Sequence, residues 1–157
     1  MSVTIAEVSA KLSEIPGLKV LPGVRPDTVR LFFPTDKFVD PDTKEKRLVV
    51  VVLLEENGEY IKVFSPHAFE AKGRHAGDVL KACMEIQWET KLIQFEYDES
   101  DGEIRPIIEW PVEDGSVTSK QLARAITGLV LIVDQYSPVL EQAARGKGVK
   151  MSLASPV

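Results

Sequence analysis

The sequence predicts an α+β domain: an antiparallel five-stranded sheet with helices packed on one side, in the order helix, three strands, helix, two strands, helix. Two observations carry this prediction. Segments with apolar alternation or a β-branched run come in one group of three and one group of two. Segments with the apolar period of a helix stand before, between and after these groups. Strand groups interrupted by single helices are typical of α+β folds.

Length and composition are those of one globular domain. A chain of 157 residues can bury about two-thirds of its unfolded surface, and 44% apolar with 27% charged residues is ordinary for such a domain. We expect residues 1–145 to form this domain and residues 146–157 to form a flexible basic tail.

Charge and hydropathy exclude two classes of partner. A net charge of −5 argues against nucleic acid, whose binders carry a basic surface. The longest apolar run, Leu48 to Leu54, is far shorter than the ~20 residues of a membrane helix. The first residues lack the basic and apolar regions of a signal peptide. We therefore expect a cytoplasmic protein that binds neither nucleic acid nor membrane.

The first helix is predicted to begin after Thr4 and to end at Pro16-Gly17. Thr4 and Glu7 have the spacing of a capping box, in which each side chain accepts a hydrogen bond from the other residue's N–H. One apolar face is formed by Ile5, Val8, Leu12 and Ile15.

The first three strands are predicted around residues 28–33, 48–54 and 60–64. Val29, Leu31 and Phe33 alternate with their neighbours, which suits a strand with one buried face. A polar loop over residues 34–47 separates it from the β-branched run 48–54, which is typical of a central strand covered on both faces. Asn57-Gly58 tolerates the positive φ angles of a tight hairpin turn.

The second helix is predicted from about Arg74 to Trp88, and its core face contains Ala76, Val79, Leu80, Cys83 and Met84. A fourth strand contains Ile93, Phe95 and Tyr97. Asp101-Gly102 turns the chain into a fifth strand over residues 104–110. Pro106 places that strand at an edge of the sheet or in a bulge, because proline cannot donate a ladder hydrogen bond.

The last helix is predicted to open with a second capping box at Thr118 and Gln121. Pro138 either kinks this helix or begins a new one, since proline suits the first helical position. The buried stripe consists of Leu122, Ile126, Leu129, Val130 and Val133.

The candidate reactive residues do not assemble into a catalytic or metal-binding pattern. His67 and His75 lack further ligands at zinc-like spacing, so we interpret both as solvated loop residues. Cys83 falls on an apolar helix face, where a free cysteine behaves as a small hydrophobe, and a single cysteine excludes an internal disulfide. Nucleotide-binding and hydrolase motifs are lacking. We therefore predict a non-enzymatic protein that needs no cofactor.

The segment from Glu89 to Asp114 is strongly acidic, with nine acidic residues against Lys91 and Arg105. A solvated hairpin face is the simplest interpretation. The alternative is electrostatic steering of a basic protein partner, which makes association depend on salt. The candidate acidic contacts are Glu96, Asp98, Glu99, Asp101 and Glu103.

The run from Leu48 to Leu54 is apolar on both faces, yet three helices can cover only one face of a sheet. Long loops, a second copy in a homodimer or a client protein could cover the other, since exposed apolar patches mark interaction sites. The candidate contacts are Val49, Val51 and Leu53, or the opposite set of Leu48, Val50, Val52 and Leu54. An edge strand near Pro106 could also accept a peptide as an added strand.

Three segments resemble the YbjN family, whose members are described as bacterial sensory transduction regulators. These are the helix Leu80 to Trp88, the hairpin Phe95 to Arg105, and the helix Gln121 to Leu140 with its Tyr136-Ser-Pro-Val-Leu140 ending. The resemblance covers roughly residues 48–140. It implies the fold of type III secretion chaperones, with no catalytic residues. Together these features predict a chaperone-like or regulatory protein-binding domain. The alternative is a small-molecule-binding domain or enzyme with a pocket between sheet and helices.

Overall fold

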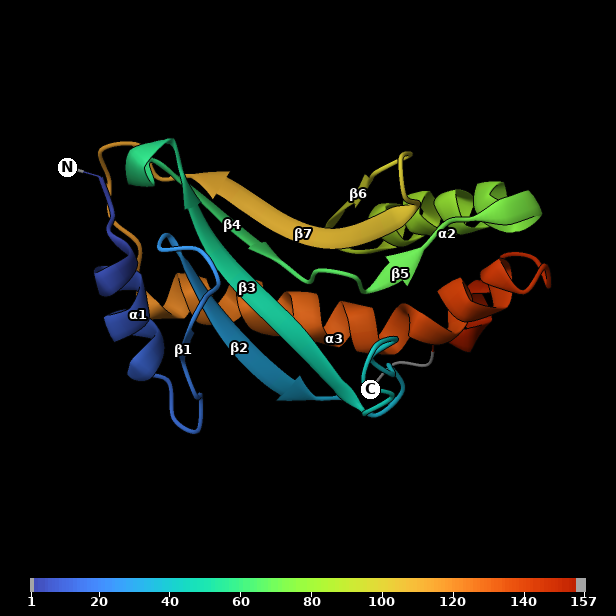
Figure 1. Cartoon of the computed structure of the whole chain (residues 1–157), viewed down its shortest axis with the longest axis horizontal. Helices are drawn as coiled ribbons and strands as arrows, with labels where there is room; N and C mark the ends of the chain where they lie inside the picture. Colours follow the sequence, from blue (N-terminus) through green and yellow to red (C-terminus); the bar gives the residue numbers. More distant parts are fainter. Residues whose placement is uncertain (1, 155–157) are drawn as a thin grey trace.

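The computed structural model describes residues 2–154, which fold into three α-helices and one antiparallel sheet (Figure 1). This confirms the predicted α+β class. In chain order the elements are α1 (Ile5–Ser13), β1 (Leu21–Pro22), β2 (Thr28–Pro34), β3 (Arg47–Glu55), β4 (Tyr60–Phe64), β5 (Phe69–Glu70), α2 (Ala76–Glu89), β6 (Gln94–Tyr97), β7 (Glu103–Pro111) and α3 (Ser119–Ala144), with short 3₁₀ turns at Glu56–Gly58, Gly73–His75 and Met151–Leu153.

The prediction of five strands is wrong, because the sheet has seven. The two additional strands, β1 and β5, contain two residues each. A two-residue strand is too short to show an alternation of apolar and polar residues, so periodicity could not predict β1 or β5. β1 pairs with β2 at one end of the sheet, and β5 pairs with β7 at the other.

The sheet order is β1-β2-β3-β4-β7-β5, and β6 pairs with β7 as well. Ile104 of β7 pairs with Phe69 of β5 and with Tyr97 of β6, so these two strands flank β7 on opposite sides. Of the two alternatives predicted for Pro106, the edge is therefore wrong, whereas a bulge fits: the four residues 65–68, between β4 and β5, stand opposite only residues 105 and 106. The carbonyl of Pro106 accepts a hydrogen bond from Ser65, one residue past β4, so the missing N–H falls just beyond the β4 ladder.

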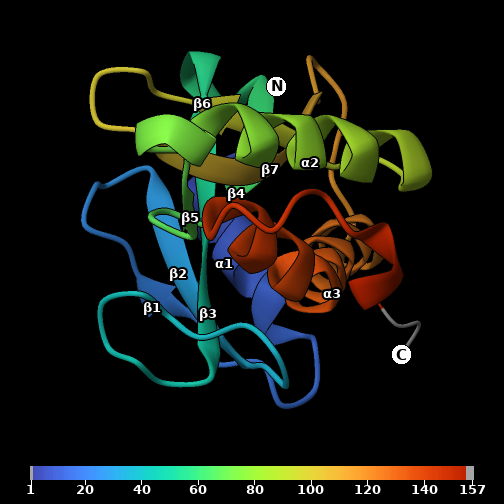
Figure 2. The same cartoon turned by 90° about the vertical axis from the view of Figure 1, so that its right-hand side faces the viewer.

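The main core lies between one face of the sheet and the helices α1 and α3. Figure 2 shows β2 and β3 on one side and these two helices on the other. Apolar residues of all four elements form one buried cluster, which includes Val8, Leu12, Leu31, Leu48, Val50, Val52, Leu122, Ile126 and Leu129. Because only this face packs against helices, more and less buried side chains alternate along β2 and β3.

Helix α2 packs against the C-terminal half of α3 and forms a second cluster with Ile104 of β7. Its buried residues are Val79, Ala82, Cys83 and Ile86. The predicted core face was therefore rotated: Met84, expected in the core, is 56% exposed, whereas Ala82 is fully buried. Both faces of α2 carry apolar residues, so periodicity alone could not separate them.

Both predicted capping boxes are present, at Thr4 with Glu7 and at Thr118 with Gln121. Helix α3 continues through Pro138 to Ala144, so no new helix begins there. Pro138 has no N–H to donate to the carbonyl of Asp134, four residues earlier. The Ser137 hydroxyl donates to that carbonyl instead, at 3.1 Å.

Part of the segment expected as a tail returns to the domain. Val149, Met151 and Ala154 pack against the cluster formed by α2 and α3. Apolar residues at these positions explain the return, because their burial offsets the entropy of ordering the chain. Residues 155–157 lie outside the described part of the structure.

Candidate binding surface on the open face of the sheet

The two faces of the sheet differ in what covers them. The helices pack on the face of Leu48, Val50, Val52 and Leu54. Val49, Val51 and Leu53 point to the opposite face, over which no helix of residues 2–154 lies (Figure 2). We call this the open face. By register, its other members on the neighbouring strands are Arg30, Phe32, Tyr60, Lys62, Phe64, Arg105, Ile107 and Glu109.

Long side chains of the open face cover much of its apolar floor. Leu53 is only 7% exposed although no helix covers it, and Lys62 stands directly opposite on β4. The guanidinium of Arg47 lies 5.2 Å from the ring centre of Phe32, and that of Arg105 lies 4.9 Å from that of Phe64. Arginine and lysine can shield apolar surface with their stems while their charges stay in water.

The apolar side chains of β2 and β3 on this face stay partly exposed. Phe32 is 36% exposed, and Val49 and Val51 are half-buried. The loop 35–46 reaches the face at one end, where Asp40 and Asp42 line a small hollow beside Val49. Loop cover, one of the three covers considered from the sequence, is therefore present at this end only in the described chain.

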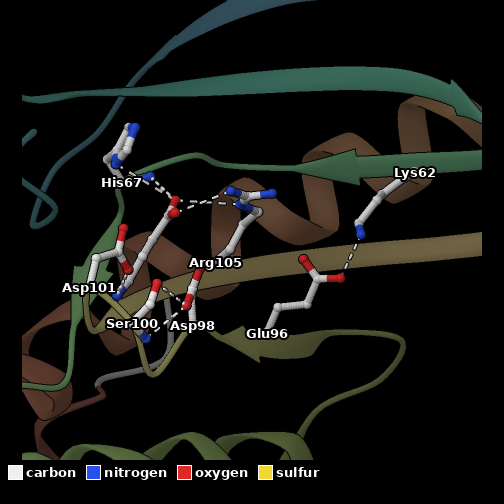
Figure 3. A network of polar contacts seen from close by, with 8 residues as sticks. Lys62, His67, Glu96, Asp98, Ser100, Asp101 and Arg105 are labelled. Atoms are coloured by element: carbon white, nitrogen blue, oxygen red, sulfur yellow. Dashed lines mark hydrogen bonds and ion pairs between the residues drawn. The ribbon is translucent and has the colours of Figure 1, made fainter.

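The acidic hairpin β6–β7 borders the open face and is held by its own carboxylates (Figure 3). Asp98 accepts hydrogen bonds from the N–H and the hydroxyl of Ser100 at 2.8 and 2.6 Å, and these bonds lower the pKa of its carboxyl. Asp101 accepts from the N–H of Glu103 at 2.8 Å. Gly102 has a φ of +80°, which confirms the predicted turn.

Glu103 anchors the hairpin to the segment that follows β4. Its carboxylate accepts from the His67 N–H at 2.8 Å and from Arg105 at 3.1 Å (Figure 3). Burial raises the pKa of Glu103, but the hydrogen bonds from His67 and Arg105 outweigh burial, so the pKa is lowered. These contacts within the domain give Glu103 a structural role that needs no partner protein.

Glu96 joins the hairpin to the open face. Its carboxylate lies 2.5 Å from the Lys62 ammonium (Figure 3). The same ammonium is 3.9 Å from Glu109. Glu96 and its neighbours line a shallow hollow of about 460 Å³, formed by Glu96, Tyr97, Asp98, Glu99, Glu103 and Arg105. Asp98, Glu99 and Asp101 are exposed at the hairpin tip, where their charges face solvent.

The structure therefore brings most of the predicted contact residues into one region. Val49, Val51 and Leu53 share the open face, and the acidic residues lie at and beyond its β6–β7 side. Sequence reasoning missed the aromatic and basic members, above all Phe32, Phe64 and Arg105. The strand register of β2, β3 and β4 would have found them, because residues directly opposite one another share a face.

Of the two histidines, His67 lies at the border of this surface, beside Val49 and Glu103, whereas His75 lies elsewhere. The His67 side chain is 68% exposed and serves Glu103 mainly through its backbone, while the His75 ring lies against Gly146. No group of three or more His, Cys, Asp or Glu residues in the described chain could hold a metal ion.

Cys83 is buried on α2, and this burial raises the pKa of its thiol to about 12. We expect the native protein to resist a thiol reagent such as Ellman's reagent at pH 8, because only the thiolate reacts. In denaturant the thiol should react within minutes and completely. Reaction of the native protein at a similar rate would contradict this packing.

The chain was compared with known proteins. No protein-family model matches it, and no curated protein is significantly similar to it. Among residues 2–154, no helix is both long enough and apolar enough to cross a membrane.

Proposed function

We propose that this domain binds a protein partner through the open face and the acidic hairpin. The observation that carries the proposal is a helix-free sheet face with an apolar strip of Phe32, Val49 and Val51 on β2 and β3; the exposed charges of Asp98, Glu99 and Asp101 lie beyond β4, at the tip of the β6–β7 hairpin. Half-buried apolar residues on a rigid central strand can anchor a partner without rearranging the fold.

The charges define the chemistry of that partner. Asp98, Glu99 and Asp101 project from the hairpin tip, where basic side chains could approach them. Such exposed charges raise association rates more than they lower dissociation rates. The expected partner therefore presents an apolar strip to β2 and β3 and, farther along its surface, lysine or arginine to the hairpin tip.

The family resemblance supports a chaperone-like or regulatory role. It rests on the α2, hairpin and α3 segments and carries no catalytic residues. A homodimer formed through the open face belongs to the same proposal, because a second copy would cover the same apolar strip.

The experiment is a selection of displayed random peptides against the whole chain, followed by affinity measurement with synthetic copies. We expect the enriched sequences to combine apolar residues with lysine or arginine. Val51→Glu should weaken their binding at least tenfold, since Val51 is a half-buried member of the apolar strip on the central strand β3. Neutralising Asp98, Glu99 and Asp101 should reduce the association rate and its dependence on salt.

The matched control is Val24→Glu, because Val24 is 91% exposed in the connection between β1 and β2, outside the apolar strip, and should tolerate the same charge without effect. Thermal unfolding of both variants checks that they fold. The proposal would be wrong if the selected peptides bound the Val51→Glu variant as tightly as they bind the wild type. Light scattering at several concentrations would show whether a second copy is the partner.

A further inference from the structure

One stretch of β7 has a neighbouring strand on only one side. β6 pairs with β7 from Tyr97 opposite Ile104 to Gln94 opposite Ile107, and it ends there. β7 continues to Pro111 and pairs along this stretch with β4 on its other side. The outer edge of residues 108–111 is therefore unpaired within the described chain.

The backbone direction along β7 follows from two hydrogen bonds. Pro106 accepts from Ser65 on the β4 side, and Glu103 accepts from Asp98 on the β6 side. Because backbone groups alternate in direction along a strand, odd-numbered residues of β7 face the β6 side. The N–H and the C=O of Glu109 thus point outward beyond the end of β6, and neither has a hydrogen-bond partner among residues 2–154.

Leu92 is the residue that leaves these groups unpaired. Extension of the β6 register by two residues would place it opposite Glu109. Its φ of +71° turns the chain away, and its side chain is 63% exposed. Between this turn and α3 lies a cleft of about 210 Å³, lined by Leu92, Ile108, Glu109, Trp110, Gln121, Arg124 and Ala125.

One backbone group on each side of Glu109 is protected against pairing. The Phe95 N–H of β6 is bound by the side-chain oxygen of Gln87 on α2, at 3.0 Å. Pro111 has no N–H and so ends the edge at its other limit. Natural sheets protect edges by such devices against unspecific pairing. Glu109 is the position between them at which both backbone groups stay available.

We propose that this cleft binds a short extended peptide segment of a partner protein, which adds to β7 in line with β6. The segment would exchange two backbone hydrogen bonds with Glu109 and place an apolar side chain against Leu92, Trp110 and Ala125. Because Gln94 and Pro111 limit the edge, three to four residues fit, as roughly 3.3 Å of strand per residue implies.

Arg124 gives the segment its charge preference. It is exposed on the α3 wall of the cleft and makes no ion pair in the described chain. An acidic residue next to the apolar one would meet its guanidinium. This preference is opposite to that of the open face, so the two sites require different partner segments.

The test is a titration of the ¹⁵N-labelled whole chain with the peptide acetyl-Val-Leu-Asp-Thr-amide, followed by NMR. We expect shifts at Glu109, Leu92 and the Trp110 indole, together with slower exchange of the Glu109 amide proton. A peptide with methylated backbone nitrogens at Val and Leu should bind at least fivefold more weakly, because it cannot donate to the Glu109 carbonyl.

Two surface variants complete the test without threatening the fold. Arg124→Glu should favour the same peptide with lysine in place of aspartate, and Leu92→Ser should weaken both peptides. Val51→Glu should leave binding unchanged, which separates this site from the open face. Equal binding of the methylated peptide, shifts confined to other surfaces, or no shifts at millimolar peptide would overturn the proposal. So would a dimer in sedimentation whose contact includes Glu109, since a second copy would then be the occupant.

Discussion

Replacement of Asp134 by alanine should lower the free energy of unfolding by about 3 kcal/mol. The Asp134 carboxylate on α3 accepts three backbone hydrogen bonds from the loop 35–46: from Asp36 at 2.9 Å, Lys37 at 2.7 Å and Phe38 at 2.8 Å. Hydrogen bonds to a charged group contribute about 1.5–3 kcal/mol each, and partial exposure here reduces that sum.

The loss should spread from the carboxylate into the core. Phe38 is 3% exposed and packs edge-on against Phe69, with ring centres 5.6 Å apart. Without its anchor the loop would release Phe38, so hydrogen exchange should accelerate across residues 36–40. Urea unfolding measures the loss. Glu141→Gln, which neutralises an exposed acidic residue on the same helix, is the control and should have little effect.

The same carboxylate predicts a pH dependence. Burial raises the pKa of Asp134, but the three backbone hydrogen bonds outweigh it, so the folded-state pKa lies below the ordinary 3.8. Its contribution is therefore complete above the unfolded-state pKa, near pH 4, and is lost as pH falls through the folded value. Asp134→Asn should flatten the acid side of the stability curve. A wild-type curve and a variant curve that stay parallel below pH 4 would exclude this role.

The features of the fold that the sequence predicted are those written in local patterns. Both capping boxes form because a hydroxyl and a carboxylate or amide stand three residues apart, which needs no tertiary partner. Long-range contacts could not be predicted in this way. The Asp134 anchor joins residues about 97 positions apart, and only the packing of α3 beneath the sheet brings them together.

The candidate site shows the same division. Val49, Val51 and Leu53 were placed on one face by the two-residue period of a strand. The face that the helices cover depends on the register between β3 and its neighbours. The sequence of β3 alone does not determine this register. The free backbone groups of Glu109 could not be predicted either. They are free because Leu92 has a positive φ that turns the chain away from β7, and a leucine in the sequence does not indicate such a conformation. Pro106 drew attention to the correct strand but to the wrong residue.

Gly58→Ala should cost about 3 kcal/mol or more, and it tests how the N-terminus is held. Gly58 has a φ of +90° in the β3–β4 connection, and a Cβ there would stand 2.0 Å from the backbone oxygen of Val3. The Val3 N–H donates to the Gly58 carbonyl at 3.1 Å, so the two backbones are bonded as well as close. A methyl group would add backbone strain of about 1–2 kcal/mol and would push Val3, 7% exposed, out of the core.

Gly73→Ala is the matched control. Gly73 also has a positive φ, +69°, but an added Cβ meets nothing within 4 Å. Its substitution should cost only the backbone strain, so the difference between the two variants measures the contact with Val3. In a domain of this size each kcal/mol lowers the melting temperature by about 2–4 °C, which calorimetry resolves easily. Deletion of residues 1–3 should remove most of the difference. If the two alanine variants melted together in the full chain, the N-terminal segment would not be docked at this turn.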